Sequence, residues 1–302
     1  MSAPGRPKGE YRSAQHEGRP ISARRKGLLD GKVAIITGAG GGLGSAYARL
    51  LAQEGASIVV NDFNAAHAEK VVREIVDGGG NAVAAVADVG NVAAGEAILK
   101  AALDVFGRVD ILINNAGILR DKSLANLTEA MWDAVVNVHL KGAFCVTQPV
   151  FRWMKDNGQG GVIVNTSSSS GLGGSFGQTN YGAAKAGIWG FSNCLALEGA
   201  KYGIRVWTLA PAAATAMTAN LLSPELAEKW AAERVAPVVL YMVSSLSGDK
   251  TNKTLFASGT KIMELKMIAS PGIANGPACT AHDISAAEHE LFLPDAPLCF
   301  NA

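Results

Sequence analysis

The chain has 302 residues, of which 48% are hydrophobic, and its formal net charge is +1. This length suits one large α/β domain or two small ones. A net charge so close to zero argues against nucleic-acid binding, which typically uses a strongly basic surface. No run of about 18 apolar residues occurs, so we expect no membrane-spanning helix. The 4 cysteines lie far apart, which argues against a disulfide framework and favours a cytoplasmic protein.

Residues 1–30 differ in composition from the rest of the chain. They contain 7 Lys or Arg against 3 Asp or Glu, and they show no apolar periodicity. This composition is typical of a flexible segment, so we predict a basic N-terminal extension. A transit peptide is the alternative, but Glu10 and Glu17 argue against it because transit peptides are poor in acidic residues.

From Lys32 onward, short β-branched runs alternate with longer segments of helical periodicity. The runs expected as strands are Val33–Thr37, Ile58–Asn61, Ala82–Val86, Ile111–Asn114, Val162–Thr166, Ile204–Leu209 and Thr254–Ala257. The segments expected as helices are Leu43–Glu54, Ala65–Asp77, Val92–Phe106, Met131–Asp156, Tyr181–Tyr202 and Pro224–Met242. Alternating strands and helices build right-handed βαβ units around a parallel sheet.

This pattern predicts an α/β fold with one doubly wound (Rossmann) domain over residues 31–270. We expect a seven-stranded parallel sheet with helices on both faces, since the apolar strand runs suit a sheet that is buried on both sides. Residues 271–302 are rich in proline and aperiodic, so we expect an irregular C-terminal tail there.

The first expected strand runs into a glycine-rich loop, Thr37–Gly44. Asp62 ends the next strand, 18 residues after Gly44. In a doubly wound sheet such a loop lies at the carboxyl edge, where backbone amides and a helix N-terminus face a pyrophosphate. An acid at the end of the second strand accepts hydrogen bonds from the adenosine ribose. The pattern therefore predicts a dinucleotide site, and the missing Lys-Ser/Thr pair excludes a P-loop.

A serine, a tyrosine and a lysine form a second candidate constellation. Tyr181 and Lys185 are four residues apart on one expected helix, so they share a face, and Ser168 follows the fifth expected strand. A neighbouring ammonium group favours the phenolate, so we expect Lys185 to lower the pKa of Tyr181. The pair is then able to exchange a proton with a substrate hydroxyl, while Ser168 holds the substrate oxygen.

Together these segments resemble the short-chain dehydrogenase/reductase family over roughly residues 30–265. The family glycine pattern is met at Thr37, Gly38, Gly42 and Gly44, and its catalytic pattern at Ser168, Tyr181 and Lys185. Three further segments match in order: Asp88-Val89, Asn114–Gly117 and Pro211–Thr215.

The resemblance implies hydride transfer between a nicotinamide and a carbinol or carbonyl carbon. It implies that Tyr181 is the acid/base, that Lys185 binds the nicotinamide ribose, and that Ser168, Gln178 and Tyr181 contact the substrate. The implied cofactor contacts are Gly38, Gly42, Leu43, Gly44, Asp62, Asp88, Val89, Asn115, Gly117, Tyr181, Lys185, Pro211, Ala214 and Thr215. Asp62 disfavours a 2′-phosphate, so we expect NAD as the cofactor.

One position departs from the family pattern. Where the family often has Asn in Val-Asn-Leu-x-Gly, this chain has His139, and we predict that His139 occupies the proton-relay position. The alternative is a histidine that only packs within its helix. This feature, with Asn115–Lys122, Phe176–Tyr181 and Val235–Leu240, resembles a narrower group. These are the (3R)-hydroxyacyl-CoA dehydrogenase parts of peroxisomal multifunctional enzyme type two and related bacterial proteins.

Two other patterns carry less weight. Gly173–Gly177 matches a nucleophile elbow around Ser175, but that motif needs a strand directly before it and a helix directly after it. The spacing of Cys279, His282, His289 and Cys299 fits no compact zinc module, so we predict no metal.

The sequence leaves two functional classes open. The first is an NAD-dependent oxidoreductase for a secondary alcohol, with (3R)-hydroxyacyl-CoA as the expected substrate and a hydroxysteroid or another bulky secondary alcohol as the alternative. The second is an inactive nucleotide-binding module, which the intact Ser168, Tyr181 and Lys185 argue against. The resemblance also implies a homodimer or homotetramer built on the Tyr181–Tyr202 helix and the helix before it.

Overall fold

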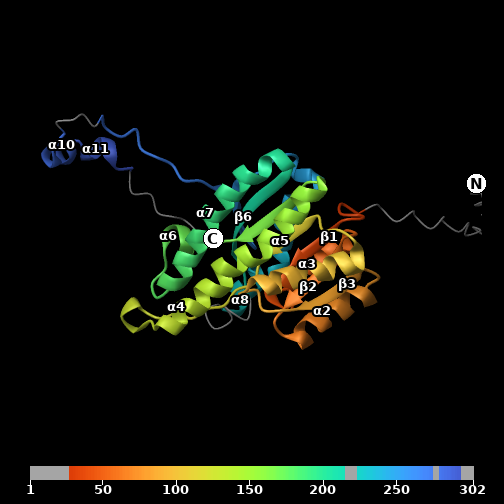
Figure 1. Ribbon diagram of the computed structural model, residues 1–302. Coiled ribbons are helices and arrows are strands. Elements are labelled where there is room, and N and C mark those ends of the chain that lie inside the picture. The colour runs from red at the N-terminus through yellow and green to blue at the C-terminus, as the bar shows by residue number, and fades with distance from the viewer. Residues whose placement is uncertain (1–26, 215–222, 275–278, 294–302) are drawn as a thin grey trace, which may run out of the picture.

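The computed structural model describes residues 27–214, 223–274 and 279–293 and forms an eight-stranded sheet of order β3-β2-β1-β4-β5-β6-β7-β8 (Figure 1). Strands β1 to β7 are parallel. The order reverses between β1 and β4. In doubly wound sheets, ligands bind at such a switch point, outside the carboxyl ends of the strands.

The strands are β1 (Val33–Ile36), β2 (Ser57–Asp62), β3 (Asn81–Val86), β4 (Ile111–Asn114), β5 (Gly161–Thr166), β6 (Ile204–Ala212), β7 (Lys253–Ser258) and β8 (Ile262–Leu265). The helices up to β6 are α1 (Gly42–Gln53), α2 (Ala65–Asp77), α3 (Val92–Phe106), α4 (Glu129–Val136), α5 (Gly142–Asn157), α6 (Ser170–Gly173) and α7 (Thr179–Gly199). After β6 come α8 (Pro224–Lys229), α9 (Ala236–Val243), α10 (Ala281–Ala286) and α11 (Glu288–Leu291).

The sheet separates two hydrophobic cores. In β1, Ala34 and Ile36 belong to one core, and Val33 and Ile35 belong to the other, because successive side chains of a strand point to opposite faces. Helices α1, α2 and α9 supply the first core, and α3, α5 and α7 supply the second, which is nearer the viewer in Figure 1. The predicted doubly wound α/β fold is confirmed.

The eighth strand is an addition to the predicted sheet. β8 pairs antiparallel with β7, at the edge of the sheet. It is only 4 residues long, and none of its side chains is buried. β1 and β4 are equally short but fully buried, whereas β8 is interrupted by Glu264 and lacks the continuous apolar run by which the other seven were found.

Two of the predicted helices are interrupted. The Met131–Asp156 prediction corresponds to α4 and α5 with the π-helical segment Asn137–Lys141 between them. The Pro224–Met242 prediction is wrong as a single helix, because α8 ends at Lys229 and α9 begins at Ala236. Pro237 lies in the first turn of α9. A proline there has no amide to continue an earlier helix, so a new helix begins around it.

The described residues at the two ends of the chain add detail to the expected tails. Leu29 is 2% exposed and belongs to the first core, although the predicted extension runs to residue 30. Helices α10 and α11 lie within residues 271–302, where irregular structure was expected; Figure 1 shows both at a distance from the sheet. A capping box formed by Thr280 and Asp283 begins α10, and its Thr-x-x-Asp spacing is a signal that the sequence carries.

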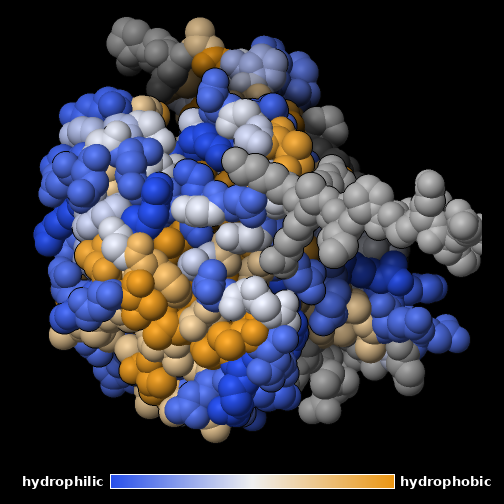
Figure 2. Space-filling model, turned by 90° about the vertical axis from the view of Figure 1, so that its right-hand side faces the viewer, coloured by the Kyte–Doolittle hydropathy of each residue, from blue (hydrophilic) through white to orange (hydrophobic). Residues whose placement is uncertain are grey.

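The surface seen in Figure 2 is mostly hydrophilic, with hydrophobic residues gathered in one area. Helices α3 and α5 pack together and carry the exposed side chains of Val92, Val105 and Phe144. Among the described residues, no helix is long and apolar enough to cross a membrane.

Candidate active site

The loops after β1 and β4 are fastened to each other by Thr37. The Thr37 hydroxyl oxygen accepts hydrogen bonds from the backbone amides of Asn115 (3.0 Å) and Ala116 (3.1 Å). In return, the Asn115 side-chain amide donates to the carbonyls of Thr37 (3.0 Å) and Gly38 (3.2 Å). Thr37 is 2% exposed. The glycine loop therefore has a defined position at the switch point of the sheet.

The glycine loop has no room for side chains at several positions, and at Gly38 and Gly44 the obstacle is backbone. Gly38 has a φ of +62°, and a Cβ there would lie 2.8 Å from the Ala116 Cα. A Cβ on Gly44 would collide with the Gly38 carbonyl oxygen. At Gly41, in contrast, a Cβ would have nothing within 4 Å, so the loop is open on this side. A bare backbone with an open side, before the first turn of α1, fits a dinucleotide pyrophosphate.

Asp62, at the end of β2, is turned toward this loop. Its Oδ2 accepts a hydrogen bond from the Gly40 amide at 3.1 Å, and its Oδ1 accepts one from the Asn64 amide at 2.9 Å. A carboxylate has about four lone-pair sites, so each oxygen retains one for a ribose hydroxyl. Asp62 thus fits the role expected of it. On the far side of the loop, Asp88 accepts from the Gly90 amide, and Val89 is 6% exposed.

The three catalytic candidates come together at the carboxyl edge of β5. Ser168 follows β5, while Tyr181 and Lys185 lie on the first two turns of α7. The Lys185 ammonium is buried, donates a hydrogen bond to the Thr166 carbonyl at 2.5 Å, and lies 5.6 Å from the centre of the Tyr181 ring. The Tyr181 phenol hydrogen-bonds the Ser168 hydroxyl.

Burial sets the ionisation of this group. It lowers the pKa of Lys185 to about 7, because the charged form has lost its hydration. Burial also raises the pKa of Tyr181, an effect that the Ser168 hydrogen bond opposes and the charge of Asp121 reinforces. The net shift of the Tyr181 pKa is upward, and the expected lowering by Lys185 stays a prediction. Burial is the largest of these effects, because a phenolate loses its hydration there.

His139 lies in the π-helical segment, directly beside Tyr181. The two rings make an edge-on contact with centroids 5.2 Å apart. The His139 Nε2 is 3.0 Å from the Ile118 amide and 2.8 Å from the Ile118 carbonyl oxygen. Burial, assisted by the charge of Lys185, lowers the pKa of His139 to about 3. His139 is therefore an uncharged hydrogen-bonding group, and π segments often occur where a side chain must be aimed at a site.

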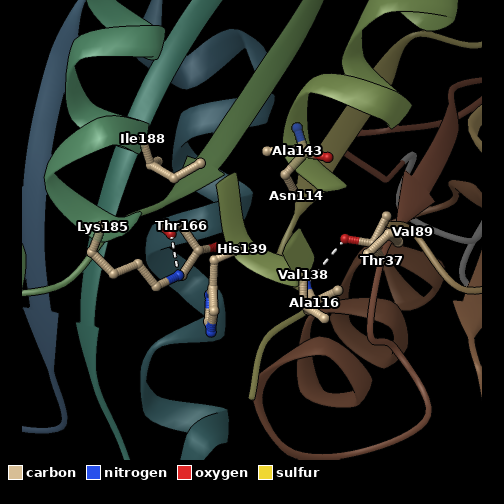
Figure 3. A pocket seen from close by; sticks show the side chains of 10 residues that line it. All are labelled: Thr37, Val89, Asn114, Ala116, Val138, His139, Ala143, Thr166, Lys185 and Ile188. Atoms are coloured by element: carbon tan, nitrogen blue, oxygen red, sulfur yellow. Dashed lines mark hydrogen bonds between the residues drawn. The ribbon is translucent and has the colours of Figure 1, made fainter. Parts of the chain in front are cut away.

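A small cavity lies beneath these residues (Figure 3). Three of the polar atoms around it have no hydrogen-bond partner among the described residues: Asn114 Oδ1, His139 Nδ1 and Thr166 Oγ1. Lys185 lines the same cavity. Buried polar atoms without a partner are rare, so they mark this cavity as part of the functional site.

A buried polar network continues from the cavity into α7. Asn114 donates to Thr147 (2.8 Å) and Asn165 (2.7 Å), and Asn165 donates to Ser192 (2.9 Å). Ser192 donates to the Ile188 carbonyl one turn back. None of these four polar residues was predicted from the sequence as a site residue. Asn114 directly precedes Asn115 in the recognised segment, but the other three carry no pattern that sets them apart.

Gly117 and Gln178 complete the expected set within the described residues. A Cβ on Gly117 would collide with the His139 ring, so the two positions are adjacent. Both ends of the Gln178 amide are engaged, by Ser170 and by Asp121. Pro211 lies next to the last residue of β6, at the carboxyl edge of the sheet. The Ala214 amide donates a hydrogen bond to the Trp230 carbonyl. Thr215 and Cys299 lie outside the described residues. Ser175 does not directly follow a strand, since α6 separates it from β5.

Comparison with known proteins identifies the family. The model for short chain dehydrogenases matches residues 32–226. The chain is 46% identical to mouse "Peroxisomal multifunctional enzyme type 2" over 223 residues, covering 71% of this chain and 30% of the mouse protein. It is 37% identical to "Hydroxyacyl-CoA dehydrogenase ChsB1" of Mycobacterium tuberculosis over 252 residues, covering 78% of this chain and 79% of that protein.

A solved structure extends the match to the whole domain. The crystal structure of a short chain dehydrogenase from Mycobacterium avium superposes with a TM-score of 0.80 at 37% identity, covering 88% of this chain and 96% of that one. The glycine loop and the Ser168–Tyr181–Lys185 group lie within the residues that the family model matches. The protein is therefore an oxidoreductase that belongs to the short-chain dehydrogenase/reductase family.

Proposed function

We propose that this protein is an NAD-dependent dehydrogenase that interconverts a secondary alcohol and a ketone, with a (3R)-hydroxyacyl-CoA as substrate. The observation that carries the proposal is the grouping of Ser168, Tyr181 and a buried Lys185 beside an open glycine loop. An inactive nucleotide-binding module has no need of this grouping. Burying a lysine costs stability, and such a module would gain no activity from it.

The residues divide the chemistry among themselves. Ser168 donates a hydrogen bond to the substrate oxygen, and Tyr181 takes the hydroxyl proton during oxidation and returns it during reduction. NAD, when bound, accepts the hydride from the carbinol carbon. Lys185 has a pKa of about 7, so it is able both to bind the nicotinamide ribose and to exchange protons with Tyr181.

The preference for NAD over NADP rests on Asp62. Both of its oxygens accept backbone hydrogen bonds, which holds the carboxylate beside the glycine loop. A 2′-phosphate placed there would meet a negative charge, and residues 39–43 and 63–64 contain no Lys or Arg to offset it.

The substrate is supported by the names of the relatives and by charge at the site. One relative is named as a hydroxyacyl-CoA dehydrogenase, and the match to a multifunctional enzyme covers 30% of that protein. The exposed Arg120 and Lys122 lie in the loop after β4, where they are placed to meet coenzyme A phosphates.

The test is a rate measurement. Reduced nicotinamide is followed at fixed NAD with (3R)- and (3S)-hydroxyacyl-CoA thioesters, hydroxysteroids and small secondary alcohols. We expect activity on the (3R) thioesters. Activity on a steroid alone would instead support the alternative substrate, and no turnover of any alcohol, with NAD bound, would support the inactive module.

A double variant tests the phosphate contact. Arg120→Ala with Lys122→Ala should raise the KM for the thioester and weaken its salt dependence, because charge contacts are screened by salt. Oxidation of a small neutral alcohol serves as the control and should hardly change. Unchanged thioester kinetics would reject the contact.

The remaining proposals concern organisation, assembly and location. We propose a basic extension over residues 1–30, one catalytic domain over 31–270 and a homo-oligomer, which light scattering would measure. We also propose a cytoplasmic location, although the mouse relative is named peroxisomal; imaging of the tagged full-length chain would decide between the two compartments.

A further inference from the structure

A row of hydrogen-bonded side chains crosses the mouth of the site. Gln178 Nε2 donates to Asp121 Oδ2 at 2.8 Å, although the two residues are 57 positions apart. Gln178 Oε1 accepts from the Ser170 hydroxyl at 2.8 Å. The Ser170 hydroxyl is also 3.0 Å from the Ser175 hydroxyl. We call Asp121, Ser170, Ser175 and Gln178 the clasp.

The direction of every bond in the clasp follows from the carboxylate. An ionised Asp121 only accepts, so Gln178 must present its amide nitrogen to Asp121 and its oxygen to Ser170. Ser170 must then donate to Gln178, which leaves its own oxygen to accept from Ser175. A single carboxylate therefore orients three polar side chains on the opposite loop.

The clasp joins the loop after β4 to the segment between β5 and α7, which carries Ser168. Asp121 belongs to the loop after β4, which also contacts His139 through Ile118. Ser170 belongs to the loop that carries Ser168, and its amide donates to the Ser168 hydroxyl oxygen at 3.2 Å. This hydrogen bond occupies one of the two acceptor sites of the Ser168 oxygen and so ties the Ser168 hydroxyl to Ser170.

Two hydrogen bonds to backbone carbonyls also join the loop after β4 to the segment that runs from β5 to the first turn of α7. The Lys122 amide donates to the Gly177 carbonyl at 2.9 Å. Asn180 is fully buried, and its side-chain amide donates to the Arg120 carbonyl at 3.1 Å. The two loops therefore meet along several residues, with Asp121 supplying the charged contact. Its negative charge also acts on Tyr181, whose pKa it raises.

We propose that Asp121 is a positioning residue, which acts through Gln178 and Ser170 to hold the Ser168 loop against the loop after β4. The inference rests on the proposed dehydrogenase function for its effect on rate, but not for its effect on the loops. It assigns Gln178 to the clasp, in place of the direct substrate contact that the sequence suggested.

The first experiment breaks the clasp and restores it. Gln178→Glu sets a second carboxylate against Asp121, so the loops should separate and kcat should fall about tenfold, as misplacement of a reacting group typically costs this much or more. Adding Asp121→Asn to Gln178→Glu reverses the pair: the amide introduced at position 121 would donate, and the carboxylate introduced at position 178 would accept from that amide and from Ser170. The double variant should recover to within about threefold of the parent.

Control measurements distinguish the effect of breaking the clasp from the effects of changing the net charge and of destabilising the fold. Asp133→Asn, on the exposed face of α4, removes one carboxylate away from the clasp and should leave kcat unchanged. All variants should keep the parent melting temperature within a few degrees, because the clasp is largely exposed and exposed contacts contribute little stability. The KM for NAD should also stay constant, since the clasp lies on the substrate side.

A second measurement needs no substrate. Hydrogen exchange of the Lys122 amide, followed by mass spectrometry, should be about tenfold faster in Gln178→Glu and should return toward the parent rate in the double variant. If exchange responds in this way but no alcohol is oxidised by the parent, the clasp stands and the proposed function fails. Unchanged exchange in Gln178→Glu, or a double variant no better than the single one, overturns the role of Asp121.

Discussion

The cofactor side and the catalytic side of this site are built from opposite materials. Around Gly38 and Gly44, the site consists of backbone that approaches other backbone, and side chains are excluded by close contacts, such as 2.8 Å from the Gly38 Cβ position to Ala116. Around Lys185 and His139, it consists of buried side chains whose pKa values burial has lowered to about 7 and about 3. The cofactor side therefore depends on the absence of side chains, and the catalytic side depends on the burial of ionisable side chains.

This difference predicts how each side fails. A substitution on the cofactor side should act through shape, so it should change stability and binding together. A substitution on the catalytic side should act through proton affinity, so it should change rate or pH dependence while the fold survives.

The largest effect is expected at Tyr181. Tyr181→Phe removes only the proton carrier, so turnover should fall by about 10²–10⁴-fold while NAD affinity stays nearly constant. Lys185→Met should reduce both turnover and NAD affinity, because we propose that Lys185 binds the nicotinamide ribose and exchanges protons with Tyr181. Stopped-flow rates and titration of NAD by calorimetry make the measurement, with Tyr202→Phe as the control. A near-normal rate in Tyr181→Phe would refute the assignment.

On the cofactor side, Gly38→Ala should be destabilising by roughly 2–4 kcal/mol and should weaken NAD binding. The backbone at Gly38 is left-handed, and the added Cβ would press on the Ala116 Cα. Gly31→Ala is the matched control, because Gly31 has a φ of +74° but nothing within 4 Å. It should cost only the strain of about 1 kcal/mol. Equal urea-unfolding free energies for both variants would show that the contact is unimportant.

His139 should give the catalytic side a pH signature. An unfolded His139 binds a proton below about pH 6.5, whereas the folded protein does not until about pH 3. The contribution of His139 to the free energy of unfolding is therefore fully present above pH 6.5 and is lost as the pH falls toward 3. Between pH 7 and pH 5 the parent should lose up to about 2 kcal/mol that His139→Asn does not lose.

The same position separates hydrogen bonding from packing. His139→Asn should retain substantial activity and His139→Leu should lose more, because leucine cannot bond to Ile118. Turnover rates of the two variants measure this difference. For the pH dependence of stability, the measurement is urea unfolding at several pH values, with the exposed His282→Asn as the control. A parent whose pH dependence matches that of His139→Asn would show that His139 is charged when folded.

The smallest effect is expected at Asp62. NAD should be preferred to NADP by more than about tenfold, or about 1.4 kcal/mol, and Asp62→Ala should reduce this ratio. Asp77→Ala removes an equal charge at the end of α2 and should leave the ratio unchanged. Ratios of kcat/KM for the two cofactors make the measurement. Equal efficiency with both cofactors in the parent would show that the Asp62 charge does not select NAD.

The two sides also differed in how far they were predictable. The glycine loop was located residue by residue, because a positive φ and a close backbone approach require glycine at set spacings after a strand. Seven strands and the order Ser168, Tyr181, Lys185 were found in the same way, from local periodicity and spacing. The π segment, the break before α9 and the edge strand β8 were missed, since each depends on packing or on a proline's exact place in a turn.

The sequence by itself determined the alternation of strands and helices, the glycine loop and the family, because these depend on the order and spacing of residues close together in the chain. Only the tertiary structure decided that burial lowers the pKa of Lys185 and raises that of Tyr181, and that Asp121 reaches Gln178. Ionisation depends on how much water the fold removes from a group, and the clasp joins residues 57 positions apart. Neither quantity exists until the chain has folded.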